Sequence, residues 1–290
     1  MATDDLPAKI GAWLSKEGFP FELQAARALR EAGWLVFHSP HYTDRETGKL
    51  REIDLYAPWG PCVGHGERRG MVSLHLVCEC KVSEKPWVVF TSQRGDGDEP
   101  YQMLVQRLRL APGPFGSRAL AHGITTCRER LSALVPGSRI GHGLTKAFAD
   151  SRSGDPTGPF AAVAGALSAA AAFSREHYAT VLQKRPGREP SAWIAIHVPI
   201  VFLRGRLFEF YLDQDGSEIL EERERLYVLV HGSSSTDDLD DPVAVQIVSG
   251  RALGHFANAA LNETQALAEA ILPEAKALSR SFRGEEKDAS

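Results

Sequence analysis

Three charged residues lie in segments that otherwise have the pattern of buried strands. Asp54 is part of REIDLYA (51–57), and Glu79 and Lys81 are part of VSLHLVCECKVS (72–83). A charge in a buried strand costs several kcal/mol unless it is paired or binds a metal ion. Because paired strands lie about 4.8 Å apart, carboxylates on neighbouring strands can bind the same ion. The pattern therefore predicts a metal site at Asp54 and Glu79.

Lys81 adds a second kind of chemistry to this pair. It follows Glu79 by two residues, so both side chains should lie on one face of the strand. An amine in that position can orient or help deprotonate an attacking water, and it can neutralise a phosphate group. Hydrolysis of a phosphodiester needs in-line attack by water and stabilisation of charge in the transition state. Asp54, Glu79 and Lys81 are the residue types that such a reaction needs, with Mg²⁺ as the metal.

Helix and strand patterns around these residues predict how they are positioned. Residues 20–34 have apolar side chains at helical spacing after a proline, which predicts an amphipathic helix that carries Glu22. Short strands are predicted at 34–39, 51–58 and 72–82. In the second strand, Glu52 and Asp54 should share one face. In the third, alternation predicts that one face carries Ser73, His75, Val77, Glu79 and Lys81.

The rest of the chain predicts further strands and helices. Residues 91–158 are rich in Gly, Pro and Arg, and we interpret them as an insertion or cap. An alanine-rich helix is predicted at 159–182, and a terminal helix at 263–282 follows several strands. This order predicts an α/β fold in which helices flank a mixed central sheet, as one domain of residues 1–290. Its predicted parts are a core at 19–90 and 159–213, the inserted segment at 91–158, and extra C-terminal strands and a helix at 214–290.

The order helix, three strands, helix, strand, with these charged residues on it, resembles the restriction-endonuclease-like PD-(D/E)xK nuclease superfamily. The matching residues are Glu22 in PFELQAARAL, Asp54 in REIDLYA, and Glu79 with Lys81 in CECK. The resemblance covers about residues 19–90 and, more loosely, 159–213. It implies a restriction-endonuclease-like core in which Asp54, Glu79, Lys81 and Glu22 are catalytic. Among these, Asp54, Glu79 and Glu22 would bind the metal.

The resemblance also implies a function. The chain would be a Mg²⁺-dependent nuclease, a metal-dependent phosphodiesterase that acts as a DNA endonuclease in bacterial defence, including antiviral defence, or in DNA repair. Mn²⁺ would substitute for Mg²⁺. Two alternatives stay open: a nuclease fold with idle catalysis that binds nucleic acid or a protein, and a nuclease that acts on RNA. A homodimer, or a partner protein of a defence system, is also compatible with the sequence.

Contacts with nucleic acid are expected from arginines in the inserted segment. QRLRLAPGPFGSR (106–118) contains Arg107, Arg109 and Arg118, close to where the active-site cleft should open. Such a cluster can bind phosphates, but it could equally form a solvated helix face. The 33 Lys and Arg residues against 37 Asp and Glu residues leave a net charge of −4. This excludes a polycationic coat, so any nucleic-acid site must be local.

The sequence predicts a cytoplasmic protein with reduced thiols. The N-terminus lacks the pattern of a signal peptide, and the longest apolar stretch, 160–173, is too short to span a bilayer, so no membrane association is expected. The four cysteines show no disulfide framework. Cys62, His65, Cys78 and Cys80 could be imagined as zinc ligands, but the C-x-C spacing on a strand suits tetrahedral ligation poorly. His75 is interpreted as a packed strand histidine.

Overall fold

The structure is a computed structural model of the 290-residue chain. It describes residues 5–45, 47–60, 62–63, 70–94, 108–110, 123, 125–127, 130–148, 158–183, 192–230 and 243–288. Among the helices in these residues, none combines the length and the hydrophobicity that crossing a membrane requires.

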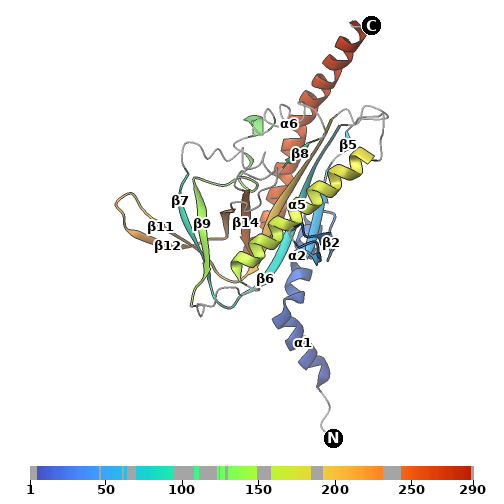
Figure 1. The fold of residues 1–290 in the computed structure, drawn as a ribbon. Helices are drawn as coiled ribbons and strands as arrows, with labels where there is room; N and C mark the ends of the chain where they lie inside the picture. Colours follow the sequence, from blue (N-terminus) through green and yellow to red (C-terminus); the bar gives the residue numbers. More distant parts are fainter. Residues whose placement is uncertain are drawn as a thin grey trace.

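Helices and strands alternate irregularly along the chain (Figure 1). The helices are α1 (Leu6–Glu17), α2 (Phe19–Glu31), α5 (Pro159–Gln183), the 3₁₀ helix η3 (Gly250–Ala252) and α6 (Leu253–Asp288). The strands of the first half are β1 (Phe37–His38), β2 (His41–Thr43), β3 (Leu50–Glu52), β4 (Leu55–Trp59), β5 (Cys62–Val63), β6 (Gly70–Val82), β7 (Trp87–Gln93), β8 (Leu108–Leu110) and β9 (Arg139–Lys146). Those of the second half are β10 (Ala192–Arg204), β11 (Leu207–Leu212), β12 (Glu218–Glu222), β13 (Arg225–Val230) and β14 (Val243–Ser249).

A mixed sheet of 12 strands forms the centre of the described structure. Its order is β1-β4-β6-β10-β14-β13-β9-β7-β11-β12, with β5 added to β6 and β8 added to β10. The two long strands β6 and β10 are parallel over their whole length, whereas β4 runs antiparallel to β6. β2 and β3 form a separate antiparallel pair. The expected α/β fold with a mixed central sheet is therefore present.

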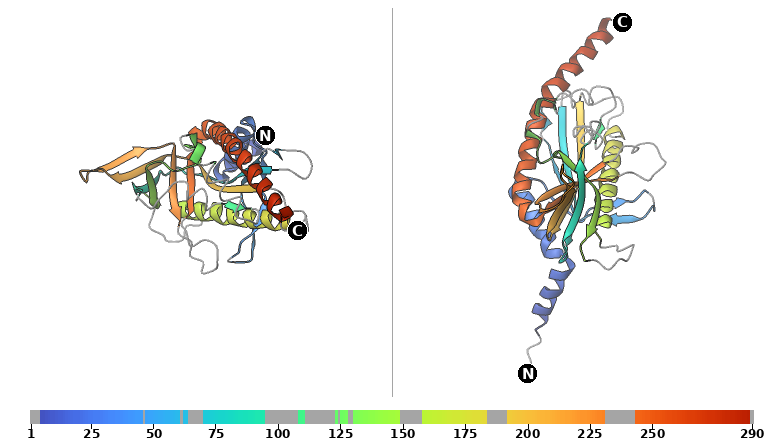
Figure 2. Two further views of the ribbon diagram at one scale, coloured as in Figure 1. Left: turned by 90° about the horizontal axis from the view of Figure 1, so that it is seen from above. Right: turned by 90° about the vertical axis from the view of Figure 1, so that its left-hand side faces the viewer.

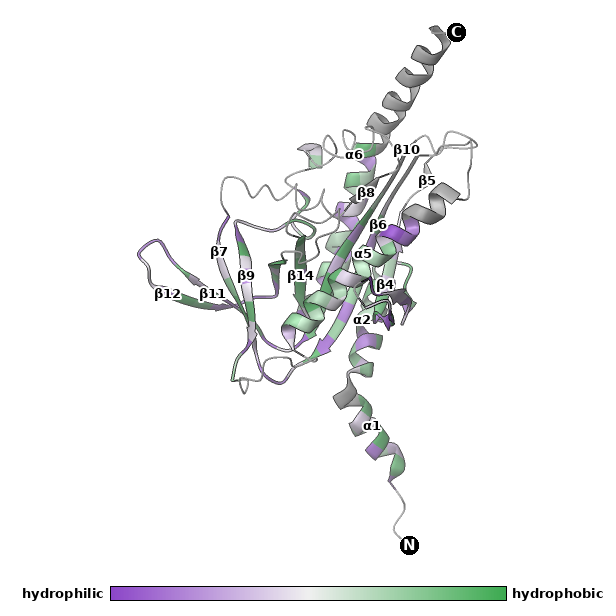
Figure 3. Ribbon diagram, viewed as in Figure 1, coloured by the Kyte–Doolittle hydropathy of each residue, from purple (hydrophilic) through white to green (hydrophobic). Residues whose placement is uncertain are grey.

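Helices cover both faces of this sheet, as the edge-on view in Figure 2 shows. α5 lies along one face over β6 and β10, and α2 and α6 lie against the other face. The small residues of α5, such as Ala162, Ala166 and Ala169, are fully buried against the strands, which allows the helix to approach closely. Figure 3 shows that β14, at the middle of the sheet, is mostly hydrophobic, as expected of a strand buried on both faces.

Apolar and polar residues alternate along β6 as the sequence predicts. Leu74, Leu76, Cys78 and Cys80 belong to the core between the sheet and helices α2 and α6. Val77 belongs to a second cluster, together with Ala169 and Ala170 of α5. Because side chains alternate along a strand, Glu79 lies on the α5 face as well.

The predicted strand 51–58 is wrong in one respect, because the chain changes sheets within it. β3 ends at Glu52 in the two-stranded sheet, and β4 begins at Leu55 in the central sheet. Ile53 and Leu55 are both fully buried but in different cores, so they do not share a face. Glu52 and Asp54 therefore belong to different sheets.

The segments predicted as an insertion and as a C-terminal extension both contribute strands to the central sheet. β9, from residues 91–158, pairs with β7 and β13. β14, from the C-terminal part, lies parallel to β10 at the middle of the sheet. The hairpin of β11 and β12 projects from the far edge (Figures 1 and 2).

Candidate functional site

Asp54 lies at the point where the chain enters the central sheet. The N–H of Ser39 donates to the backbone oxygen of Asp54 at 2.9 Å, and the N–H of Ile53 donates to the oxygen of Pro40 at 3.1 Å. These two bonds fix the backbone on both sides of the change of sheet. Asp54 precedes Leu55, which lies opposite Cys78 in the antiparallel pair β4–β6. Asp54 is therefore placed opposite Glu79.

The carboxylate of Asp54 is held by the backbone of the neighbouring strand. The N–H of Cys80 donates to Asp54 Oδ2 at 2.6 Å. The register between β4 and β6 ends at Leu55, so the side chain of Asp54 satisfies a donor that lies beyond the last paired residue of β4. This bond gives the carboxylate one defined orientation beside Glu79.

The electrostatics of Asp54 are those of a crowded carboxylate cluster. Burial and then the nearby charge of Glu79 raise the pKa of Asp54 to about 7, with a smaller contribution from Glu22. The Cys80 hydrogen bond and the charge of Lys81 oppose this rise. Like charges held together favour the neutral acid unless a cation neutralises them. A divalent cation at this position would supply that neutralisation.

Glu79 and Lys81 form an ion pair at the end of β6, with 2.6 Å between Lys81 Nζ and Glu79 Oε1. Burial alone would lower the pKa of Lys81, but the Glu79 carboxylate outweighs it and raises that pKa. The ammonium therefore partly compensates the acidic cluster. α5 passes close above this pair, since a Cβ built on Gly165 would lie 3.9 Å from Glu79 Oε2.

Glu22 lies in the first turn of α2 and belongs electrostatically to the same cluster. Its pKa is raised by burial, then by the charges of Glu52 and Glu79. Glu52 itself is half exposed, and its Oε2 is 3.9 Å from His41 Nε2 across the β2–β3 pair. The structure thus brings together Glu22, Asp54, Glu79 and Lys81, and Glu52 is close enough to Glu22 to raise its pKa.

The arginines predicted to contact nucleic acid are only partly covered by the structure. Arg107 and Arg118 lie outside the described residues. Arg109 is in β8, opposite Ala195 of β10, and only its backbone is described. The residues considered as zinc ligands are also only partly described. Cys78 and Cys80 are buried core residues, whereas His65 is outside the described residues.

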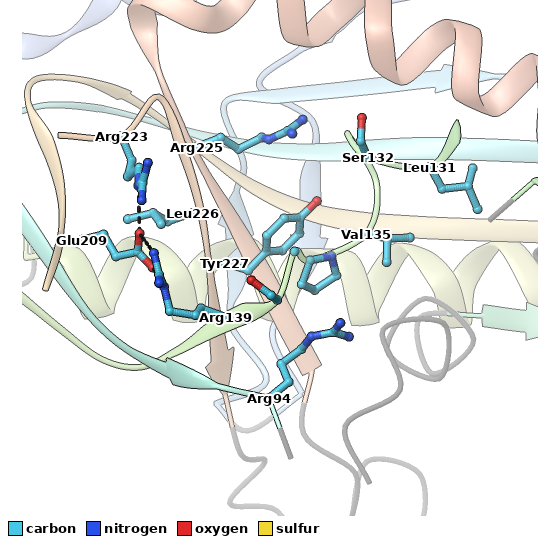
Figure 4. Close-up of a pocket in the computed structure, with 13 residues that line it drawn as sticks. Arg94, Leu131, Ser132, Val135, Arg139, Glu209, Arg223, Arg225, Leu226 and Tyr227 are labelled. Carbon is cyan, nitrogen blue, oxygen red and sulfur yellow. Dashed lines mark hydrogen bonds and ion pairs between the residues drawn. The ribbon is translucent and has the colours of Figure 1, made fainter. Parts of the chain in front are cut away.

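Sequence reasoning missed a basic cavity on the half of the sheet that contains β9, β11 and β13 (Figure 4). Its volume is about 460 Å³, and its lining includes Arg94, Arg139, Arg223 and Arg225. Glu209 accepts hydrogen bonds at 2.8 Å from the Nε atoms of Arg139 and Arg223. Burial would raise the pKa of Glu209, but these bonds and one from Thr91 lower it. The residues come from separate segments of the chain, so no local sequence pattern could have revealed the cavity.

Comparison with models of known protein families, with curated proteins and with solved structures gave no match. The chemistry of the site is therefore argued from its own residues. The carboxylates of Glu22, Asp54 and Glu79, with Lys81 beside them, form a set of hard oxygen donors that suits Mg²⁺ or Mn²⁺, and the pKa values of Glu22 and Asp54 are raised.

Proposed function

We propose that this chain is a Mg²⁺-dependent nuclease that hydrolyses phosphodiester bonds, with DNA as its substrate and internal cleavage as its mode of action. Asp54, Glu79 and Glu22 would hold the metal, and Lys81 would act on the attacking water and the phosphate. A role in bacterial defence or DNA repair is part of this proposal and depends on the family resemblance.

One observation carries the proposal: two carboxylates from adjacent strands are held together beside a lysine in a partly buried position. Asp54 is fixed by the Cys80 N–H, and Glu79 is fixed by its 2.6 Å ion pair with Lys81. Burial and the charge of Glu79 raise the pKa of Asp54 to about 7, which shows how unfavourable a second anion is there without a cation. A purely structural pair would gain more from apolar side chains of similar volume.

The order of elements also supports the proposal. The succession α2, β1, β4, β6, α5, β10 has the order helix, three strands, helix, strand that the resemblance implies. β2 and β3 are added between β1 and β4, β5 is added between β4 and β6, and β7 to β9 precede α5. We infer that these elements form a restriction-endonuclease-like core, with Glu22, Asp54 and Glu79 at the positions that this core would require.

Each residue of the site has a separate task in this proposal. The Cys80 N–H orients the Asp54 carboxylate, so the donor atoms are arranged before substrate arrives. Bound Mg²⁺ would polarise the phosphate and lower the pKa of a water molecule. Lys81 is charged while it pairs with Glu79, so it can donate a hydrogen bond to a phosphate oxygen. A cation that neutralises Glu79 removes part of this pairing, which favours the neutral amine as a proton acceptor.

The decisive experiment is a matrix of substrates and metals with the purified full chain. Supercoiled plasmid, linear duplex, single-stranded DNA and RNA are each incubated with Mg²⁺, Mn²⁺, Ca²⁺ or EDTA. We expect cleavage of DNA with Mg²⁺ and Mn²⁺. Ca²⁺, which coordinates at longer distances and with looser geometry, should support binding but little cleavage.

Each other outcome has a defined meaning. Conversion of the supercoiled plasmid to a nicked or linear form demonstrates internal cleavage, whereas degradation of the linear duplex with the plasmid left intact would replace it with cleavage from an end. Cleavage of RNA alone would change the substrate but keep the site. Cleavage that is undiminished in excess EDTA, or the absence of any cleavage with Mg²⁺ and Mn²⁺, would refute the proposed mechanism.

A further inference from the structure

Three histidines meet between the central sheet and α5, away from the carboxylate cluster. His75 of β6 and His197 of β10 are direct partners across the two parallel strands. Their rings stack with 4.4 Å between centroids and an angle of 10°. His177 of α5 approaches both rings edge-on, with centroid distances of 4.9 Å to His75 and 5.8 Å to His197. One ring nitrogen from each histidine lies within 4.8 Å of the others.

Among the described residues, burial and the absence of hydrogen-bond partners distinguish His197 from ordinary core residues. His197 is only 2% exposed. Within the described part of the chain, neither of its ring nitrogens has a hydrogen-bond partner. A buried polar group without a partner is unfavourable by about 1–3 kcal/mol, so native proteins rarely keep one without a reason. The unpaired ring nitrogens of His197 therefore indicate a ligand to which they would bind.

His75 has the partners that a metal-binding histidine commonly has. Its Nδ1 lies 2.6 Å from the hydroxyl of Tyr56, and its Nε2 lies 2.8 Å from Ser73 Oγ. If one nitrogen binds a metal, the other keeps a hydroxyl that fixes the tautomer and the orientation of the ring. The Tyr56 ring in turn stacks on His75 and contacts Phe173 of α5, which supports this arrangement from the side.

We propose that His75, His177 and His197 form a binding site for a transition-metal ion of the Zn²⁺ type. Imidazole nitrogen suits Zn²⁺, Co²⁺, Ni²⁺ and Cu²⁺, whereas Mg²⁺ prefers oxygen donors. Tetrahedral Zn²⁺ with bonds of about 2.0–2.1 Å places its ligand atoms about 3.3 Å apart. The three nitrogens thus need to approach by at most about 1.5 Å, which ring rotation can supply. Three protein ligands leave a fourth position for water or another group.

The electrostatics of the pocket agree with this assignment. Burial, and for His75 and His197 also the neighbouring imidazoles, lower the pKa values of all three histidines. The rings are therefore neutral at neutral pH, which is the state that binds a metal. His177 is partly exposed, so an ion can enter from the side of α5.

The histidine site is independent of the proposed nuclease site. His75 precedes Glu79 by four residues on one strand, which corresponds to about 13 Å. A metal bound there would connect β6, β10 and α5, and α5 is the helix that passes above Glu79. Its direct effect is on the stability of this face of the sheet, and it requires no nuclease activity.

The test is a titration of the metal-stripped full chain with Zn²⁺ and Co²⁺, carried out in an Asp54→Asn, Glu79→Gln background. That background removes two of the three carboxylate charges of the other site. We expect one Zn²⁺ per chain by equilibrium dialysis, a rise in melting temperature, and the visible absorption of four-coordinate Co²⁺. Mg²⁺ in excess should not compete.

Two variants and one control locate the site. His177→Gln changes a partly exposed helix position, and His197→Phe replaces the buried ring by an apolar ring. Each variant should weaken Zn²⁺ binding by at least ~100-fold, because loss of a residue that only hydrogen-bonds to a metal ligand can already cost that much. Circular dichroism verifies that each variant folds. His255→Gln, at an exposed position of α6, should bind like the parent. Absence of Zn²⁺ binding by the parent, or unchanged affinity in both variants, would overturn the proposal.

Discussion

Two clusters that share strand β6, one through Glu79 and Lys81 and the other through His75, differ in charge and in the type of donor atom. The carboxylate cluster of Glu22, Asp54 and Glu79 is rich in negative charge and contains a lysine. The histidine cluster of His75, His177 and His197 is uncharged at neutral pH. Burial disfavours charge at both places, but its effect on the pKa is opposite: it raises the pKa of Asp54 and lowers that of His197.

Under our two proposals, this difference would give one strand two metal-binding chemistries. The oxygen donors at the end of β6 are of the kind that Mg²⁺ prefers, and the side chains of Glu79 and Lys81 are partly exposed. The nitrogen donors around the middle of the strand are of the kind that Zn²⁺ prefers, and two of the three histidines, His75 and His197, are buried. Changes that convert one donor set should therefore affect cleavage or zinc binding, but not both.

The largest expected effect is that of neutralising the central carboxylates. Asp54→Asn retains an acceptor for the Cys80 N–H, so the backbone contact survives while the charge is lost. Asp54→Asn and Glu79→Gln should each lower the rate of plasmid cleavage by about 10²–10³, the scale of one group that stabilises transition-state charge. Initial rates at saturating Mg²⁺ measure this loss. Glu84→Gln, an exposed acid just after β6, is the matched control. Normal cleavage by either variant would show that the site is misassigned.

Lys81→Ala should lower the rate by about 10², with Mg²⁺ affinity unchanged or increased. The amine acts on water and phosphate, and its removal leaves Glu79 without its ion-pair partner. Lys81→Arg should restore little, because a permanently charged, planar guanidinium cannot accept a proton. Parallel measurements of rate and of Mg²⁺ binding separate the two roles. If Lys81→Gln loses metal binding, the lysine has a structural role instead.

Glu22→Gln should lower cleavage by about 10- to 100-fold, the scale of groups that support a metal site from outside. Burial and then the charges of Glu52 and Glu79 raise the pKa of Glu22, so its carboxylate lies within electrostatic reach of the cluster. Glu52→Gln should change the rate by less than about threefold, because this half-exposed residue belongs to the β2–β3 pair. Steady-state rates of the two variants decide the matter. The reverse order would assign Glu52, and not Glu22, to the metal site.

The carboxylate cluster was predictable because its residues follow local patterns. Alternation along 72–82 correctly placed Glu79 and Lys81 on one face, opposite the apolar residues of the core. The change of sheet at Ile53 was not predictable, because REIDLYAP alternates regularly and gives no turn signal. Only the pairing of β3 with β2 and of β4 with β6 shows it.

No local pattern in the sequence could predict the histidine cluster. His75 alone was interpreted as a packed strand residue, and nothing in its neighbourhood pointed to His177 or His197. The register that makes His75 and His197 partners extends along 13 residues of two parallel strands, and a parallel register is set by tertiary packing. Helix α1 was not predicted either, although Leu6, Ile10 and Trp13 stand at helical spacing; all three side chains are exposed in the structure.

The smallest expected effect is on the stability of the metal-free protein, where the two clusters should oppose each other. Asp54 has a pKa of about 7 against an ordinary value of 3.8, so its contribution to stability is complete below pH 4 and is lost as the pH rises to 7. His197 has a pKa of about 3 against 6.5, so its contribution is present above pH 6.5 and is lost as the pH falls. Between pH 4 and 6.5 the two slopes have opposite signs and partly cancel in the wild type.

Variants should therefore reveal each slope separately. Relative to wild type, Asp54→Asn should gain about 3 kcal/mol in the free energy of unfolding as the pH rises from 4 to 7. His197→Phe should gain a similar amount as the pH falls from 6.5 to 4, because the unfolded wild type then binds a proton that the variant cannot. Urea unfolding in EDTA across this range measures both differences. If the stability differences of the two variants from wild type changed in the same direction with pH, burial would not have opposite effects on the pKa values of Asp54 and His197.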